Sequence, residues 1–142
     1  MIAFLILFVI NLFILYVTQE PQRLVEVKEK YRILREHLIE TNHEKFHMLK
    51  RCIPVTGILR MKGAVGYNTN KGGEIAVCLD GEVNEIFHVL IHELAHCTVN
   101  EYEHSDLFWN NYIELRNICL DLGIYQKIPT KTEFCGEHVQ DK

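Results

Sequence analysis

The strongest constraint on the fold is the run from Ile86 to Cys97, which reads IFHVLIHELAHC. His92 and His96 stand four residues apart, so on an α-helix their side chains lie on the same face, about one turn from each other. At about 100° per residue, such a helix turns an apolar face to a core and collects its polar side chains opposite, namely His88, His92, Glu93 and His96. The run therefore predicts a buried helix that offers two histidines to one metal ion.

The overall composition is that of one compact domain. The chain has 142 residues, 48% of them apolar, and a net charge of -4. Its basic residues alternate with acidic ones, so charge gives no indication of nucleic-acid binding.

The cysteine pattern favours reduced thiols. Five cysteines are an odd number, and none forms a C-x-x-C pair. We therefore expect mostly buried, unpaired cysteines in a domain that faces a reducing compartment.

The first 17 residues are apolar, with Asn11 the only strongly polar side chain. As a helix they would span about 25 Å, slightly less than a hydrocarbon layer of about 30 Å. Neither a basic start nor a small-x-small cleavage site is present, so residues 1–18 are expected to be an uncleaved membrane anchor. The nearby basic residues all follow this segment, which places the remaining chain on the cytosolic or virion-interior side.

Apolar residues at steps of three and four predict an amphipathic helix over residues 22–40, packed against the domain. His43 to His47 then repeats the spacing of the metal motif as HEKFH. Lys45 would repel a bound dication, and no apolar face supports the pair. We interpret this second motif as a solvated helix end without metal.

Short β-prone runs follow at residues 57–61, 64–67 and 74–79, and the turn-forming residues 68–73 predict a hairpin between the last two. Run 74–79 is expected at the sheet edge, where a peptide could bind as an added strand. The tail from residue 124 is expected to be irregular, with one short strand near Phe134.

A catalytic zinc site takes three protein ligands and keeps a position open. His104 is the favoured third ligand, because it follows a short loop before a helix that Ser105 can cap. Glu101, Glu103 and Asp106 are the alternatives. Glu93 is then free to act as general base toward a water that the metal activates. His88 is expected in the cleft wall or behind the ligands.

The motifs His92-Glu93-Leu94-Ala95-His96 and His104-Ser105-Asp106-Leu107-Phe108-Trp109 resemble the H-E-L-x-H and H-x-x-x-F-W elements of WLM metallopeptidases, relatives of SprT-like proteases. Seven residues separate the second and third histidines, as in small WLM-like proteins of large DNA viruses. The resemblance covers roughly residues 50 to 138. It implies a minimal zincin-like α+β fold with a small sheet beside the metal helix, Zn2+ on His92, His96 and His104, and peptide-bond hydrolysis with Glu93 as catalytic residue.

These observations predict three segments: an anchor (1–18), a helical segment (19–50) and a metallopeptidase domain (51–142) that forms one globular unit with the helical segment. The leading hypothesis is a membrane-anchored zinc metallopeptidase that acts on a protein or peptide. The alternative is a non-catalytic membrane protein or binding module braced by zinc, which applies if His88 or Cys97 closes the fourth metal position.

Overall fold

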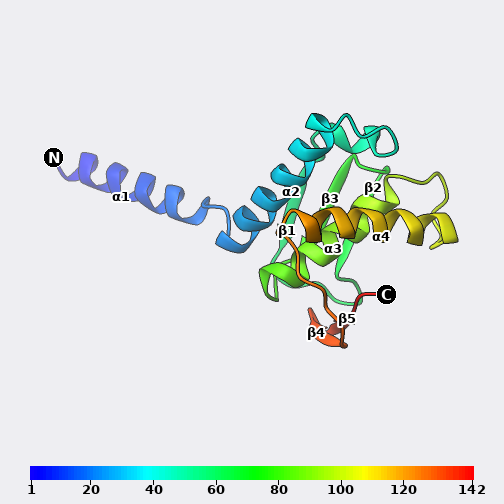
Figure 1. Cartoon of the computed structure of the whole chain (residues 1–142). Coiled ribbons are helices and arrows are strands. Elements are labelled where there is room, and N and C mark those ends of the chain that lie inside the picture. Colours follow the sequence, from blue (N-terminus) through cyan, green and yellow to red (C-terminus); the bar gives the residue numbers. More distant parts are fainter.

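The computed structural model of the protein describes all residues from 1 to 142 and has an α+β architecture (Figure 1). The elements are, in order, α1 (Ile2–Val17), α2 (Gln22–Glu40), the 3-10 helix η1 (His47–Lys50), β1 (Val55–Ile58), β2 (Gly66–Thr69), β3 (Glu74–Cys78), α3 (Val83–His96), α4 (Asp106–Asp121), β4 (Thr132–Phe134) and β5 (Glu137–Val139). One continuous hydrophobic core joins α2, α3, α4 and both sheets.

The larger sheet has the strand order β1-β3-β2. β2 and β3 form the expected antiparallel hairpin, with Gly66 opposite Val77, whereas β1 pairs with β3 in parallel. Four consecutive residues of β3, from Ile75 to Cys78, are buried, as is usual for a strand with neighbours on both sides. The expectation that run 74–79 lies at the edge is therefore wrong, because β1 and β2 are the edges. β1 and β2 also lie two residues away from the predicted starts at 57 and 64.

Three helices form the region of the metal motif, and α3 contains the motif itself. α2 has the predicted bounds and buries the predicted stripe, which consists of Leu24, Val27, Tyr31, Leu34 and Leu38. α3 contacts α2, α4, β2 and β3, so its apolar side is enclosed by the rest of the domain. α4 begins at the predicted Ser105 cap, whose hydroxyl accepts a hydrogen bond from the Phe108 N–H, and ends before Gly123 at φ 70°.

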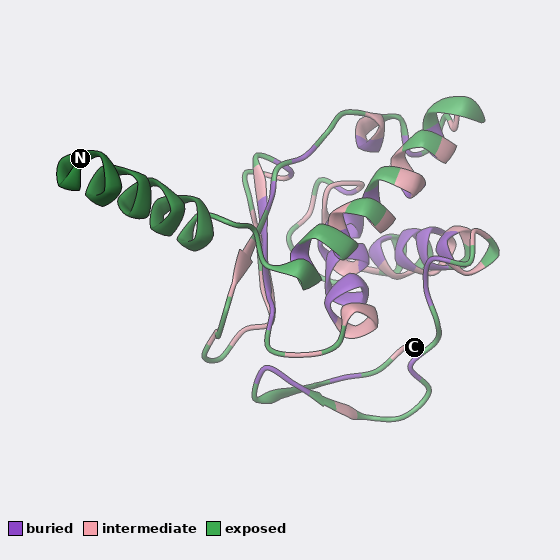
Figure 2. Ribbon diagram, turned by 90° about the vertical axis from the view of Figure 1, so that its left-hand side faces the viewer, coloured by how far each residue is buried: buried purple, intermediate pink, exposed green.

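α1 projects away from the domain and is exposed along its whole length (Figures 1 and 2). Taken singly, none of the helices has both the length and the apolar character needed to cross a membrane. Only α1 and α2 together meet that requirement, and they are bent by 54° where they meet.

The C-terminal segment is more ordered than the expected irregular tail. β4 and β5 form an antiparallel hairpin, and a disulfide between Cys78 and Cys135 ties its turn to the end of β3. The expectation of five reduced cysteines is thus wrong for this pair, and the cysteines do not indicate a reducing compartment. Their Cα atoms lie 6.5 Å apart although 57 residues separate them, so only the folded chain reveals the pairing.

Candidate metal centre and cleft

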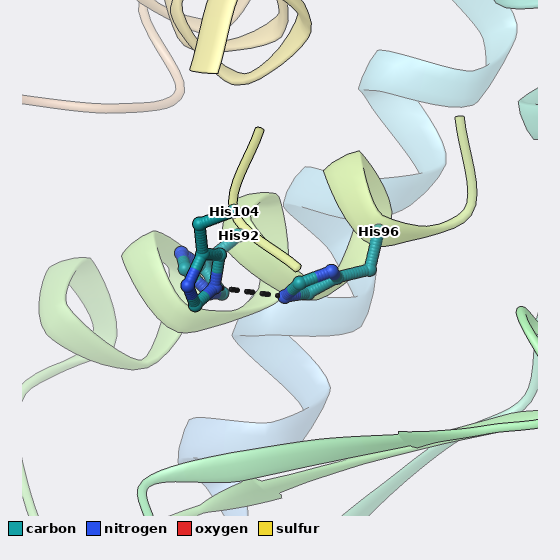
Figure 3. A group of neighbouring side chains, drawn as sticks. All are labelled: His92, His96 and His104. Carbon is teal, nitrogen blue, oxygen red and sulfur yellow. Dashed lines mark hydrogen bonds between the residues drawn. The ribbon is translucent and has the colours of Figure 1, made fainter. Parts of the chain in front are cut away.

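Three imidazoles converge where α3 ends and α4 begins. His92 and His96 project from α3, and His104 reaches them from the connecting loop (Figure 3). Nε2 of His104 lies 3.0 Å from Nε2 of His92 and 3.1 Å from Nε2 of His96. These three side chains can hold a metal ion, since one nitrogen of each lies within 4.8 Å of the others.

The chemistry of this cluster fits a metal better than a set of mutual hydrogen bonds. Nitrogens that share a tetrahedral metal at about 2.05 Å lie about 3.3 Å apart, close to the observed separations. Burial lowers the pKa of His92 to about 3 and that of His96 to about 4, and the neighbouring imidazoles add to both shifts. Both rings are therefore neutral at pH 7, which is the form that binds metals.

The β2–β3 hairpin holds the C-terminal end of α3, where backbone carbonyls have no partner within the helix. The Asn68 side-chain amide donates to the carbonyl of Glu93 at 2.9 Å. The Lys71 ammonium donates to the carbonyls of His96 and Val99, at 3.3 and 3.0 Å, and also to that of Glu101. Its positive charge at the helix C-terminus interacts favourably with the negative end of the helix dipole. The hairpin thereby fixes both the metal helix and the loop that leads to the third histidine.

Aromatic packing holds the imidazoles from the other side. The Phe108 ring lies with its centroid 5.0, 4.4 and 4.7 Å from those of His92, His96 and His104. Trp109 packs against His104 at 5.4 Å. Because Phe108 is fully buried, the three rings have little freedom to turn away from one another.

Glu93 lies beside the cluster in a cavity of about 450 Å³. The cavity lies between the metal helix, the β2 segment and the C-terminal segment, and it is lined by Ala64, Val65, Gly66, His88, Val89, His92, Glu93, His96, His104, Trp109, Tyr112, His138, Val139 and Gln140. Glu93 is 8% exposed, and this burial raises its pKa to about 7. A smaller cavity of about 170 Å³ reaches Glu93 and His96 from the side of Lys71 and Tyr102.

A buried hydrogen-bonded network forms the inner wall of the larger cavity. Tyr125 and Tyr112 donate to the two carboxylate oxygens of Asp141, at 2.6 and 2.8 Å. Nδ1 of His88 lies 2.9 Å from the Tyr125 hydroxyl and 3.2 Å from that of Tyr112. His88 thus lies in the cleft wall, as predicted.

The alternatives weighed for the metal ligands lie outside the cluster. Glu101 accepts a hydrogen bond from the Ser105 hydroxyl, and Cys97 accepts one from Asn68 at 3.0 Å. In the second motif, His43 stacks on Phe46 and the segment is not α-helical, so its spacing does not place two histidines on one face.

Three residues that support the site were missed from the sequence: Asn68, Lys71 and Asp141. Asn68 and Lys71 lie in the predicted hairpin turn, where such residues are ordinary, and Asp141 lies 49 residues beyond His92. Nothing in the local pattern distinguishes them from solvent-exposed side chains.

The comparisons with known proteins point to a viral relative. Over 80 aligned residues, the chain is 36% identical to an uncharacterized protein of Acanthamoeba polyphaga mimivirus. The alignment covers 49% of this chain and 41% of the mimivirus protein, so the match spans less than half of that relative. No family model matches the chain, and no solved structure matches it.

Proposed function

We propose that this chain is a membrane-anchored metallopeptidase with a zincin-like domain of the WLM type, which hydrolyses peptide bonds of a protein or peptide substrate. The single observation that carries the proposal is the convergence of three imidazoles in a cavity that also holds the buried carboxyl of Glu93. That combination matches the donor set and the adjacent base of a hydrolytic zinc site.

Zinc is the metal proposed for His92, His96 and His104, because imidazole ligands and a three-residue set suit it. When bound, it would supply Lewis acidity that lowers the pKa of a water ligand and polarises a carbonyl. His88 and Cys97, which could have closed a fourth position, do not belong to the cluster that His92, His96 and His104 form. This arrangement favours a catalytic site over a purely structural one.

Glu93 would move the proton during hydrolysis. Its carboxylate takes a proton from the attacking water as the water oxygen bonds to the peptide carbon. The same carboxyl then gives that proton to the amine nitrogen as the carbon–nitrogen bond breaks. Burial raises the pKa of Glu93 to about 7, which suits a group that must both accept and donate a proton near neutral pH.

The free edge of β2 is the proposed substrate-binding strand, in place of run 74–79. β2 is paired only on its β3 side, and residues 64–66 line the cavity. A peptide added to that edge would run past Glu93 and the histidines with its backbone hydrogen-bonded to the sheet.

The membrane anchor proposed for residues 1–18 rests on the exposure and composition of α1. Its 16 residues contain no charged side chain, and none of them is buried by the domain. Its length of about 24 Å would require a thinned bilayer or flanking side chains that extend to the membrane interface. After expression and cell fractionation, the full chain should be found in the membrane pellet. A form lacking residues 1–18 should be found in the supernatant. Equal distribution of both forms would contradict the anchor.

Comparison of zinc-loaded wild type with Glu93→Gln tests the enzyme proposal. Both proteins are incubated with a proteome-derived peptide library, and new termini are identified by mass spectrometry. Glu93→Gln should retain one zinc and lose cleavage by a factor of about 100 to 10,000, because only the proton transfer is removed. Glu103→Gln, in an exposed loop position, is the matched control and should cleave like wild type. Cleavage by Glu93→Gln at the wild-type rate would contradict the proposal, and so would the absence of cleavage by the zinc-loaded wild type.

A further inference from the structure

His88 lies in the inner wall of the cavity and does not belong to the metal cluster. It precedes His92 by one helical turn, is 7% exposed and lines the same cavity as Glu93. Its hydrogen-bonded neighbours decide which of its two ring nitrogens carries a proton.

The protons of the network can be counted. The carboxylate of Asp141 can only accept, and it accepts from Tyr125, from Tyr112 and from the Ile128 N–H at 2.7 Å. Each tyrosine hydroxyl has a single proton, and both are used on Asp141. The contacts between the two hydroxyl oxygens and Nδ1 of His88 must therefore be donated by the imidazole. Nδ1 carries the proton.

The other nitrogen of His88 is then a hydrogen-bond acceptor. Burial lowers the pKa of His88 below its usual value of 6.5, so the ring is neutral at pH 7 and Nε2 has a free lone pair. Nε2 has no hydrogen-bond partner in the protein. The side-chain atoms that lack a partner and are also closed to solvent are Arg35 Nε, Glu85 Oε2, Asn111 Oδ1 and Arg116 Nε, so Nε2 of His88 is not among them. Nε2 therefore borders the cavity that His88 lines.

A substrate side chain can reach this nitrogen. Successive side chains of an added strand point to opposite faces of the sheet, so alternate residues of a peptide on β2 would point toward α3. The cavity continues on that side from Glu93 to His88, Val89 and Tyr112. Its volume of about 450 Å³ leaves room for a substrate side chain beside the histidine cluster.

The inner wall carries no uncompensated charge. Asp141 accepts three hydrogen bonds, and its Oδ1 lies 3.5 Å from Nη1 of Arg116, whose side chain is 5% exposed. A charged substrate group at this wall would lose its hydration without meeting an unpaired opposite charge among the residues that form the wall. An aliphatic group would leave the Nε2 lone pair without a donor.

On the proposed peptidase function, we infer that His88 is a specificity-determining residue, whose Nε2 selects substrates with an uncharged hydrogen-bond donor, as in Ser, Thr, Asn or Gln, at a residue next to the cleaved bond. Tyr125, Tyr112 and Asp141 are positioning residues, because they hold the imidazole with Nδ1 protonated and Nε2 toward the cavity.

The first test needs no catalysis. Nitrogen-15 NMR of histidine-labelled Glu93→Gln, loaded with zinc, distinguishes a protonated from an unprotonated ring nitrogen. The spectrum should show Nδ1 protonated and Nε2 bare at His88, with assignment from the signals lost in His88→Phe. N-acetyl-threonine N-methylamide should shift the Nε2 signal, and the isosteric valine compound should shift it less. A protonated Nε2 at neutral pH, or equal shifts with the two compounds, would overturn the inference.

The second test reads selectivity from the peptide library. Wild type should cleave sites with Thr three- to tenfold better than matched sites with Val, and Gln over Glu by a similar factor, as expected for one additional hydrogen bond. His88→Phe should still cleave but lose this preference. Tyr125→Phe, which keeps the imidazole and loosens its orientation, should reduce the preference partially. An aliphatic preference in wild type, or an unchanged profile in His88→Phe, would overturn the inference.

The two tests separate this inference from the proposed function. If zinc-loaded wild type cleaves nothing, the peptidase proposal fails, and the NMR result still decides whether the cavity binds donors through His88. If cleavage occurs without the predicted preference, the peptidase proposal stands and the role of His88 is rejected.

Discussion

Gly66 lies so close to Val89 that a β-carbon on Gly66 would come within 2.6 Å of Cγ1 of Val89. The same atom would lie 3.1 Å from the carbonyl oxygen of Ala76 in the neighbouring strand. The absence of a side chain thus lets the edge strand β2 approach the metal helix at the cavity wall. The short distance between the edge strand β2 and helix α3 therefore sets the width of the cleft at Glu93.

Gly66→Ala should therefore impair both folding and activity. The added methyl group must push β2 away from α3, at a cost of about 1–3 kcal/mol in the free energy of unfolding. Peptide cleavage should fall between about 10- and 100-fold, because the substrate strand would be displaced from Glu93. Thermal unfolding and cleavage kinetics measure the two effects.

Gly57→Ala, in the opposite edge strand, is the matched control for Gly66→Ala. Its β-carbon would meet Cδ1 and Cγ of the buried Leu79 at 2.5 and 2.9 Å, so this substitution also strains the core, but Gly57 does not line the cavity. It should lower stability as well, and it should leave cleavage per folded molecule unchanged. Full activity in Gly66→Ala would disprove the proposed role of the β2 edge.

Loss of a histidine should have different effects in the metal cluster and in the second H-E-x-x-H motif. His104→Ala removes one of three convergent nitrogens and should weaken zinc binding by more than about 100-fold, the upper range for loss of a residue that merely supports a ligand. His47→Ala, in the second motif, should leave zinc affinity unchanged. Competition against a chromophoric chelator measures both. Comparable losses in the two variants would show that the second motif contributes to metal binding.

Sequence patterns predicted the local features of this fold well. The bounds of α2, the Ser105 cap and the hairpin between β2 and β3 each depend on residues close together in the chain, so periodicity and turn chemistry were sufficient. The convergence of His104 with His92 and His96 was also predicted, because the short loop restricts where the third histidine can lie.

The missed features depend on contacts between distant residues. The parallel pairing of β1 with β3, which makes β3 central, follows from packing of both strands against the helices. The Cys78–Cys135 bond joins residues 57 positions apart, and Asp141 acquires its role only after β4 and β5 fold back to the cavity. Spacing within the sequence carries no signal for such contacts.

Lys71→Met should weaken zinc binding, although Lys71 is not one of the proposed metal ligands. The substitution leaves the carbonyls of His96, Val99 and Glu101 without their shared donor and removes the positive charge at the end of α3. We expect a loss of about 1–3 kcal/mol in the free energy of unfolding and zinc affinity lower by about tenfold. Calorimetric titration with zinc and denaturant unfolding measure these changes.

Lys62→Met, at an exposed position, controls for the loss of one positive charge. It should match wild type in both measurements. If Lys71→Met also matches wild type, the hydrogen bonds from the β2–β3 turn do not hold the loop that carries His104.

Asp141→Asn should destabilise the protein in a pH-dependent way. Burial alone would raise the pKa of Asp141, but hydrogen bonds from Tyr125, the Ile128 N–H and Tyr112 outweigh it and hold the pKa below 3.8. A carboxyl with a lowered folded pKa stabilises the protein fully above its unfolded pKa of about 3.9, and this contribution is lost as the pH falls through the folded value. At pH 7 the variant should lose about 2–4 kcal/mol, since a buried network loses its charged acceptor.

The difference in unfolding free energy between wild type and Asp141→Asn should therefore shrink below about pH 4. A second pair, in which both proteins also carry His88→Phe, removes the titration of the neighbouring imidazole from the comparison. Asp121→Asn, at an exposed position of α4, should show little difference from wild type at any pH. Urea unfolding between pH 2.5 and 7 provides the measurement. A difference that stays constant or grows below pH 4 would mean that Asp141 is not the ionised acceptor on which the orientation of His88 depends.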